Sequence, residues 1–117
     1  MASQVAAPTP PEFSILLALA DGERHGYEIM LTIARDSLGG GRVGPTTLYR
    51  SIRRLLEKGL IAESDERPDP RLDDQRRRYY RLTPRGLDAA RAETARLRRL
   101  VLLAEQKALV PVSEDRA

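Results

Sequence analysis

Arginine is concentrated in two stretches of the chain that contain no acidic residue. The first runs from residue 44 to 56 and carries Arg50, Arg53 and Arg54; the second runs from Arg76 to Arg85. A guanidinium group donates two parallel hydrogen bonds from a planar fork, which suits phosphate and the edge of guanine. The two stretches therefore predict binding to a polyanion, and double-stranded DNA is the first candidate partner.

Hydroxyl groups near these arginines add further hydrogen bonds to phosphate. We expect Thr47, Arg50 and Arg53 to read base edges, and Thr46, Tyr27, Tyr49 and arginines of the second stretch to hold the DNA backbone. The full set of predicted DNA-binding residues is Tyr27, Thr46, Thr47, Tyr49, Arg50, Arg53, Arg54, Arg76, Arg77 and Arg78. Two alternatives stay open, because a charged helix face is often only a solvated surface and a basic patch can also bind an acidic protein. The formal net charge of +3 does not separate them.

The sequence contains few residues that could support catalysis or metal binding. The chain has no cysteine and one histidine, His25. A metal site would need carboxylates to complete it, and no spacing suggests a Ser-His-Asp triad. We therefore expect no enzymatic activity, no metal and no cofactor. His25 is expected to pack or to contact phosphate at the start of a helix.

No membrane-spanning or targeting segment is indicated by the sequence. The longest late apolar run, from Leu100 to Ala104, is far below the roughly 18 residues that suggest a membrane span. The first residues lack the basic region and apolar stretch of a signal peptide. A cytoplasmic location without a membrane partner is the resulting expectation.

Three helices are predicted in the first half of the chain, over residues 10–20, 25–37 and 45–58. Thr9 is the expected N-cap of the first, with Glu12 at the capping-box position, and Pro45 opens the third. Each helix has apolar residues at helical spacing that we expect to be buried. These faces are Phe13, Leu16, Leu17 and Ala20; Ile29, Met30, Ile33 and Ala34; and Leu48, Ile52, Leu55 and Leu56.

Two short strands, 60–66 and 76–82, are predicted around a loop rich in proline and aspartate. In the second strand we expect Tyr80 and Leu82 to point inward and Arg77, Tyr79 and Arg81 outward, because strand side chains alternate between faces. The order helix, helix, helix, hairpin is typical of a winged helix-turn-helix, whose third helix enters the major groove. The predicted fold class is mainly α with a small β-hairpin: a winged helix-turn-helix domain plus a long C-terminal dimerisation helix.

That last helix is predicted to begin at Pro84, after the N-cap Thr83, and to continue to about Leu109. From Leu97 onward most of its circumference is apolar. A single small domain can hardly cover such a surface, so we expect a second copy of the chain to cover it. The predicted dimer-interface residues are Phe13, Leu97, Leu100, Val101, Leu103 and Ala104.

Four segments of the chain carry a family resemblance when they are taken together and in order. They are residues 25–29 (HGYEI), 45–49 (PTTLY), 55–61 (LLEKGLI) and 78–86 (RYYRLTPRG). Together they resemble the signature of the PadR family of transcriptional regulators, and the single C-terminal helix is similar to that of its short members. The resemblance implies a winged-helix dimer joined by that helix, and in many members a repressor that a small molecule releases from DNA. The chain departs from the signature at Thr46, where glycine is usual, and at Arg50, where proline is usual.

The predicted domain organisation has four parts: a disordered tail over 1–8, a DNA-binding domain over 9–83, a dimerisation helix over 84–110 and a flexible tail over 111–117. The predicted function is sequence-specific transcriptional regulation by a homodimeric repressor on an inverted-repeat operator. A small-molecule effector is a further candidate partner. The alternative is a winged-helix module that binds an acidic protein.

Overall fold

Four helices and three strands form within residues 7–37, 43–64 and 78–109, the parts of the chain that the computed structural model describes. The helices are α1 (Pro10–Leu19), α2 (Gly26–Asp36), α3 (Pro45–Glu57) and α4 (Pro84–Gln106). The strands are β1 (Arg24–His25), β2 (Ile61–Glu63) and β3 (Tyr79–Leu82). The tip of the predicted hairpin, with Arg76 and Arg77, lies outside the described residues, as do positions 1–6 and the predicted tail 111–117.

The start of α1 is fixed by its own sequence and by an ion pair. Thr9 Oγ1 accepts a hydrogen bond from the Glu12 amide, and Glu12 Oε1 accepts one from the Thr9 amide, so the predicted capping box is present. Glu12 is only 1% exposed. Its two carboxylate oxygens lie 3.2 and 3.3 Å from Lys58 Nζ. The pair ties the start of α1 to the C-cap of α3.

The predicted buried face of α1 is wrong in part. Ile15, Ala18 and Leu19 are buried with Leu16, whereas Leu17 is 54% exposed and Ala20 is also exposed. The segment is apolar at almost every position, so its spacing does not select one face. Packing against α2, α3 and α4 makes the selection.

The three strands form an antiparallel sheet in the order β1-β3-β2. β1 was not predicted, because two residues are too few to show an alternating pattern; α2 consequently begins at Gly26, one residue later than predicted. Arg24 pairs with Tyr80 across the sheet, and Glu63 pairs with Tyr80 from the other side. Tyr80 points inward as predicted and is 1% exposed. Tyr79, on the opposite face of the strand from Tyr80, is half-buried, and its ring meets that of His25 edge-on with the ring centroids 5.4 Å apart.

The core lies between the sheet and the first three helices. The predicted stripe of α3 is confirmed for Leu48, Ile52 and Leu55, while Leu56 is half-buried. On α2, Ile29 and Ile33 are buried as predicted, Met30 is half-buried and Ala34 is exposed. These inward residues orient both helices, and they leave the opposite face of α3 to solvent.

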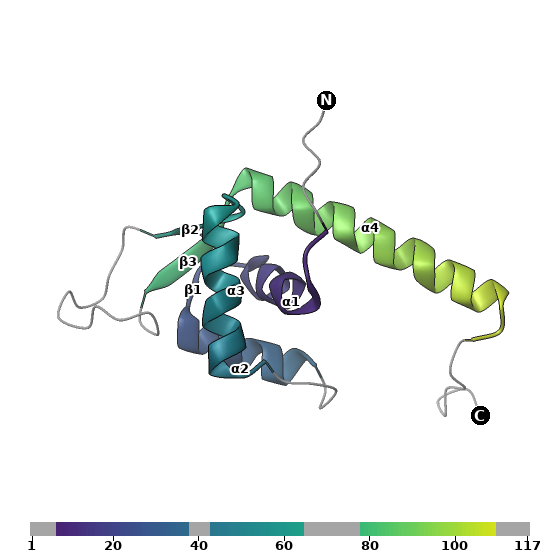
Figure 1. Ribbon diagram of the computed structural model, residues 1–117, viewed down its shortest axis with the longest axis horizontal. Coiled ribbons are helices and arrows are strands. Elements are labelled where there is room, and N and C mark those ends of the chain that lie inside the picture. Colours follow the sequence, from purple (N-terminus) through teal and green to yellow (C-terminus); the bar gives the residue numbers. More distant parts are fainter. Residues whose placement is uncertain (1–6, 38–42, 65–77, 110–117) are drawn as a thin grey trace.

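Helix α4 begins against the core and then leaves it. Thr83 Oγ1 caps the Gly86 amide at 3.0 Å and donates to the Gly59 carbonyl at 2.7 Å. Figure 1 shows the far half of α4 extending away from the other elements. It ends at Gln106, three residues before the predicted end. Three packed helices, an antiparallel wing and a long final helix confirm the predicted fold class.

Candidate nucleic-acid interface

The exposed face of α3 carries most of the residues predicted to bind DNA. Leu48, Ser51, Ile52 and Leu55 hold one face of the helix against the core, and this fixes the rest of its circumference outward. The exposed residues of the predicted set on this helix are Thr46, Thr47, Arg50, Arg53 and Arg54. Tyr49 is half-buried, so it lies at the edge of this face and not on it.

The charges on α3 favour the approach of an anion. No ion pair joins Arg50, Arg53 or Arg54 to an acid among the described residues. The first turn of α3 has no acidic residue, and Gly44 as N-cap supplies no side-chain hydrogen bond. Amide N–H groups at such an end can donate to phosphate. The face is therefore positively charged and open to an anion.

A shallow depression of about 360 Å³ lies on this face. It is lined by Pro45, Thr46, Tyr49, Arg50 and Arg53. The two guanidinium groups and one threonine hydroxyl offer donors, with the rings of Pro45 and Tyr49 as apolar surface. The arrangement suits a phosphate or a base edge, and it offers no group positioned as a nucleophile with a general base.

His25 is a capping residue in this structure. Its Nδ1 accepts a hydrogen bond from the Glu28 amide at 3.1 Å, and its own amide donates to Glu28 Oε1 at 3.1 Å. Of the two roles expected for His25, packing at a helix start is thus observed. Tyr27, the next residue but one, is 49% exposed near the same end of α2.

The wing presents its arginines differently from α3. Arg78, a predicted phosphate contact, is half-buried, and its Nη1 lies 3.3 Å from a carboxylate oxygen of Glu63 on β2. Arg81 on β3 is exposed. No pattern in the sequence singles out Glu63. Only the strand register, which places Glu63 opposite Tyr80, brings it beside the second arginine stretch.

The phenol of Tyr80 lies at the same place in the wing. Burial, and after it the nearby carboxylate of Glu63, raise the pKa of Tyr80 to about 12, while the charge of Arg78 acts in the opposite direction. A tyrosine held neutral in this way is part of the support for the wing and does not act as a proton donor near neutral pH.

The second predicted surface lies on α4. Leu100, Val101 and Leu103 are about half exposed, while Leu97 and Ala104 are half-buried. Phe13 on α1 is also half-buried. Leu100, Val101 and Leu103 thus expose apolar side chains on the half of α4 that extends from the body of the molecule, whereas Phe13 lies on another helix.

The described residues contain neither a metal site nor a membrane-spanning helix. No group of three or more His, Asp or Glu side chains there is arranged to hold a metal ion. None of the helices formed by those residues is both long enough and apolar enough to cross a membrane.

A basic third helix beside an antiparallel wing defines a winged helix-turn-helix protein of the DNA-binding class. The family model of the transcriptional regulator PadR-like family matches residues 15–92, and the chain belongs to this family. Members of this family are transcriptional regulators, and DNA binding follows from membership.

Two individual proteins are similar to the chain in sequence. The transcriptional regulator Rv3488 of Mycobacterium tuberculosis is 40% identical over 72 residues, which are 62% of this chain and 61% of that protein. An uncharacterised 37.1 kDa protein in transposon TN4556 of Streptomyces fradiae is 36% identical over 86 residues, or 74% of this chain. The chain spans only 22% of that protein's length.

Solved structures show the same fold. A transcriptional regulator from Clostridium thermocellum superposes with a TM-score of 0.70 at 26% identity, covering 82% of this chain and 87% of the other. The PcaV transcriptional regulator from Streptomyces coelicolor, in complex with its natural ligand, superposes with a TM-score of 0.64 at 26% identity, over 92% and 65% of the two chains.

Proposed function

We propose that this protein is a homodimeric repressor that binds an inverted-repeat operator by inserting α3 into the major groove. One observation carries the proposal: the exposed face of α3 presents three arginines that pair with no acid among the described residues. Unpaired guanidinium groups on a helix of this fold are placed to meet phosphates and base edges. Arg78, by contrast, already has Glu63 as a partner.

Within this surface we assign two kinds of contact. Thr47, Arg50 and Arg53 read base edges. Thr46, Tyr27 and the wing arginines hold the phosphate backbone, which fixes the register of the protein on the duplex. Tyr49, a predicted phosphate contact, is not assigned one, because its hydroxyl oxygen is buried. Arg54 can serve either purpose, since it is exposed nearer the end of α3.

Dimerisation through α4 gives the repressor its two-fold symmetry. The apolar residues from Leu97 to Ala104 lie on the half of the helix that has left the core, so a second copy is the natural cover for them. A two-fold dimer would present its two α3 helices to successive major grooves, roughly 34 Å apart, on an inverted repeat.

A small-molecule effector that lowers DNA affinity completes the proposal. The structural neighbour PcaV was solved in complex with its natural ligand, which supports ligand control in a transcriptional regulator of similar fold. Because the target is operator DNA, we place the protein in the cytoplasm.

The test begins with selection of bound duplexes from a randomised DNA pool. Fluorescence anisotropy then compares the selected duplex with a scrambled one over a series of salt concentrations. We expect tight binding to the selected duplex, with log affinity falling linearly against log salt by about 0.9 for each phosphate neutralised. Arg50→Gln is expected to reduce this slope, while Arg91→Gln on α4 is the control that keeps it.

The outcome separates DNA binding from the alternative function. Equal and weak binding to the selected and scrambled duplexes would contradict the operator hypothesis. Retention of an acidic protein by the wild-type chain, but not by the Arg50→Gln variant, would then favour a protein-interaction module using the same face.

A further inference from the structure

A buried carboxylate connects the first turn of α1 to the end of the recognition helix α3. Glu12 is only 1% exposed, and its two carboxylate oxygens accept hydrogen bonds from Lys58 Nζ, at 3.2 and 3.3 Å. One of these oxygens also accepts a hydrogen bond from the Thr9 amide at 3.0 Å. Lys58 is the C-cap of α3, and its amide donates to the Arg54 carbonyl at 3.0 Å. The ion pair therefore joins two helix ends that are 46 residues apart in the sequence.

Stability alone does not account for this ion pair. Burial of the carboxylate costs desolvation free energy, and replacement of a buried ion pair by apolar residues of similar volume is often neutral or stabilising. The pair adds direction, because its hydrogen bonds fix a distance and an angle, whereas apolar contacts are non-directional. Leu48, Ile52 and Leu55 hold α3 against the core. Lys58 adds a directional constraint at one end of that helix.

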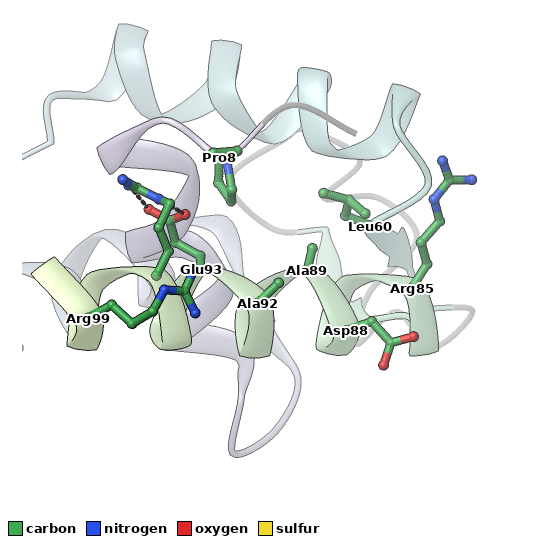
Figure 2. A pocket seen from close by; sticks show the side chains of 10 residues that line it. Pro8, Leu60, Arg85, Asp88, Ala89, Ala92, Glu93 and Arg99 are labelled. Atoms are coloured by element: carbon green, nitrogen blue, oxygen red, sulfur yellow. Dashed lines mark hydrogen bonds and ion pairs between the residues drawn. The ribbon is translucent and has the colours of Figure 1, made fainter. Parts of the chain in front are cut away.

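Glu93, another buried carboxylate, forms its ion pair within a single helix. Its partner Arg96 lies three residues further along α4. Figure 2 shows Glu93 on this helix, with dashed lines to the group that it binds. A pair of this kind can stabilise α4 but cannot fix an angle between two helices. The pair of Glu12 and Lys58 can do so, because its members come from the ends of two helices that pack against each other.

A small change of angle at Lys58 would be amplified at the other end of α3. The helix has 13 residues and is therefore about 20 Å long, at a rise of about 1.5 Å per residue. A tilt of about 10° at its C-terminal end would move its N-terminal end, with Thr46 and Thr47, by about 3 Å. This displacement is close to the rise of one base pair, about 3.4 Å. Helix α1 also packs against α4, the proposed dimerisation helix, so its angle to α3 determines where each protomer presents its recognition helix.

We infer that Lys58 is a positioning residue for DNA binding: held by Glu12, it sets the angle of α3 and thereby the distance between the two recognition helices of the dimer. Lys58 acts through α3 and needs no contact of its own with DNA. The ion pair thus selects operators by the spacing of their half-sites, in addition to the bases that α3 reads. This selection rests on the proposed function, whereas the constraint on the angle belongs to the single chain.

The angle is measured first, on the full chain without DNA. The chain has no cysteine, so Leu17→Cys on α1 and Thr46→Cys on α3, both at exposed positions, accept one spin label each. The labelled protein is diluted with an excess of unlabelled protein, and double electron–electron resonance reports the distance between the two labels of one protomer. We expect a narrow distance distribution. Glu12→Gln should broaden it, because glutamine keeps the capping acceptor for Thr9 but loses the ion pair.

Two further variants make this measurement specific. Glu93→Gln is the matched control, because it also removes a buried ion pair, but one that lies within α4, and it should leave the distribution narrow. The double variant Glu12→Gln with Lys58→Met leaves no lysine without its partner and should still broaden the distribution. Circular dichroism confirms that each variant is folded. Equal distributions for Glu12→Gln and Glu93→Gln, whether narrow or broad, would overturn the inference.

Selection by spacing has its own readout. Anisotropy compares the selected duplex with duplexes whose half-sites are one base pair closer together or further apart. We expect wild type to prefer the selected spacing by about tenfold, and Glu12→Gln to reduce this preference about threefold without changing affinity for an isolated half-site. Glu57→Gln removes an exposed charge beside Lys58 and should keep the wild-type preference.

The remaining outcomes separate positioning from other roles. A Glu12→Gln protein with a broadened distance distribution but an unaltered spacing preference would overturn the positioning role. So would a Lys58→Met protein whose half-site affinity and salt dependence fall while those of Glu12→Gln do not, because Lys58 would then bind phosphate directly. A wild-type protein with a narrow distance distribution and no affinity for the selected duplex would contradict the proposed function and not the constraint on the angle.

Discussion

Arg53 offers the most direct test of base reading by a single side chain. It is exposed on α3, lines the depression with Arg50, and has no acidic partner among the described residues. Its charge is therefore available to DNA without first breaking an internal ion pair. Arg78 must give up or share its contact with Glu63 before it can bind phosphate.

If Arg53 makes a bidentate contact to guanine, Arg53→Ala should lose about 1 to 3 kcal/mol of binding free energy to the selected duplex. The preference at one operator position should relax at the same time. Competition binding with single-base variants of the duplex measures both effects. The Arg91→Ala protein is the control, and an unchanged base-preference profile for Arg53→Ala would remove Arg53 from the reading set.

His25 contributes through the hydrogen bond that its ring accepts at the start of α2. His25→Ala removes this cap and should lower the free energy of unfolding by about 1 kcal/mol. His25→Asn keeps a side-chain acceptor at the N-cap and should recover most of the loss. Urea unfolding measures both variants; equal destabilisation by Ala and Asn would show that ring packing against Tyr79 matters more than the cap.

Ionisation of Tyr80 is expected to lower the free energy of unfolding at high pH. Its pKa is about 12 in the folded protein against about 10 in an unfolded chain. The fold therefore favours the neutral phenol, and this contribution to stability is complete below pH 10 and is lost as the pH rises from 10 toward 12. The loss amounts to at most about 3 kcal/mol, since each pKa unit corresponds to roughly 1.4 kcal/mol.

Tyr80→Phe should accordingly flatten the decline in unfolding free energy above pH 10. Tyr79→Phe is the matched control, since Tyr79 is only half-buried on the same strand. Urea titrations at intervals between pH 8 and 11.5 make the comparison. A Tyr80→Phe protein that declines as steeply as the Tyr79→Phe protein would rule out ionisation of Tyr80 as the cause.

At the scale of elements, one close contact sets the direction in which α4 leaves the domain. A Cβ atom added to Gly86 would lie only 1.9 Å from the Leu60 carbonyl oxygen. Only glycine allows the first turn of α4 to rest on the backbone between α3 and β2. Together with the hydrogen bonds of Thr83, this contact couples the long helix to the recognition helix.

Gly86→Ala should therefore be costly although alanine favours helices. The overpacking is expected to lower the free energy of unfolding by about 1 to 3 kcal/mol or more. Arg85→Ala, one residue earlier and exposed, is expected to change it by less than about 0.5 kcal/mol. Thermal or urea unfolding measures the stability of both variants. Equal stability would show that the backbone around Gly86 and Leu60 can shift at little cost in free energy.

Elements with a strong local signal could be predicted from the sequence, and those defined by their neighbours could not. Thr9 and Pro45 marked the starts of two helices, and the spacing of Leu48, Ile52 and Leu55 identified the inner face of α3. The uniformly apolar α1 gave no unique face, and β1 exists only because β3 pairs with it. The same holds for the candidate site. Its arginine-rich stretches can be recognised in the sequence, whereas the Glu63–Arg78 pair depends on the strand register and could not be predicted.

At the scale of the whole molecule, the proposed DNA binding by the basic face of α3 depends on the proposed dimerisation through the apolar half of α4. One protomer has a single recognition helix, and one major-groove contact gives limited affinity and reads only a short site. In the proposed dimer, a second protomer joined through Leu100, Val101 and Leu103 would double the contacts and would also remove apolar surface from water. Dimerisation and tight operator binding should therefore be lost together.

The double variant Leu100→Lys with Leu103→Lys tests this link without shortening the chain. Two charges on the exposed half of α4 should prevent association, because each lysine would have to be desolvated at an apolar interface. We expect analytical ultracentrifugation to report a folded monomer, and anisotropy to report affinity for the full operator reduced at least tenfold, with binding to an isolated half-site unchanged. Arg98→Lys, which conserves charge on the same helix, should remain dimeric. A double variant that stays dimeric and binds the full operator as tightly as wild type would exclude this half of α4 as the interface and would direct attention to the exposed Leu17 on α1.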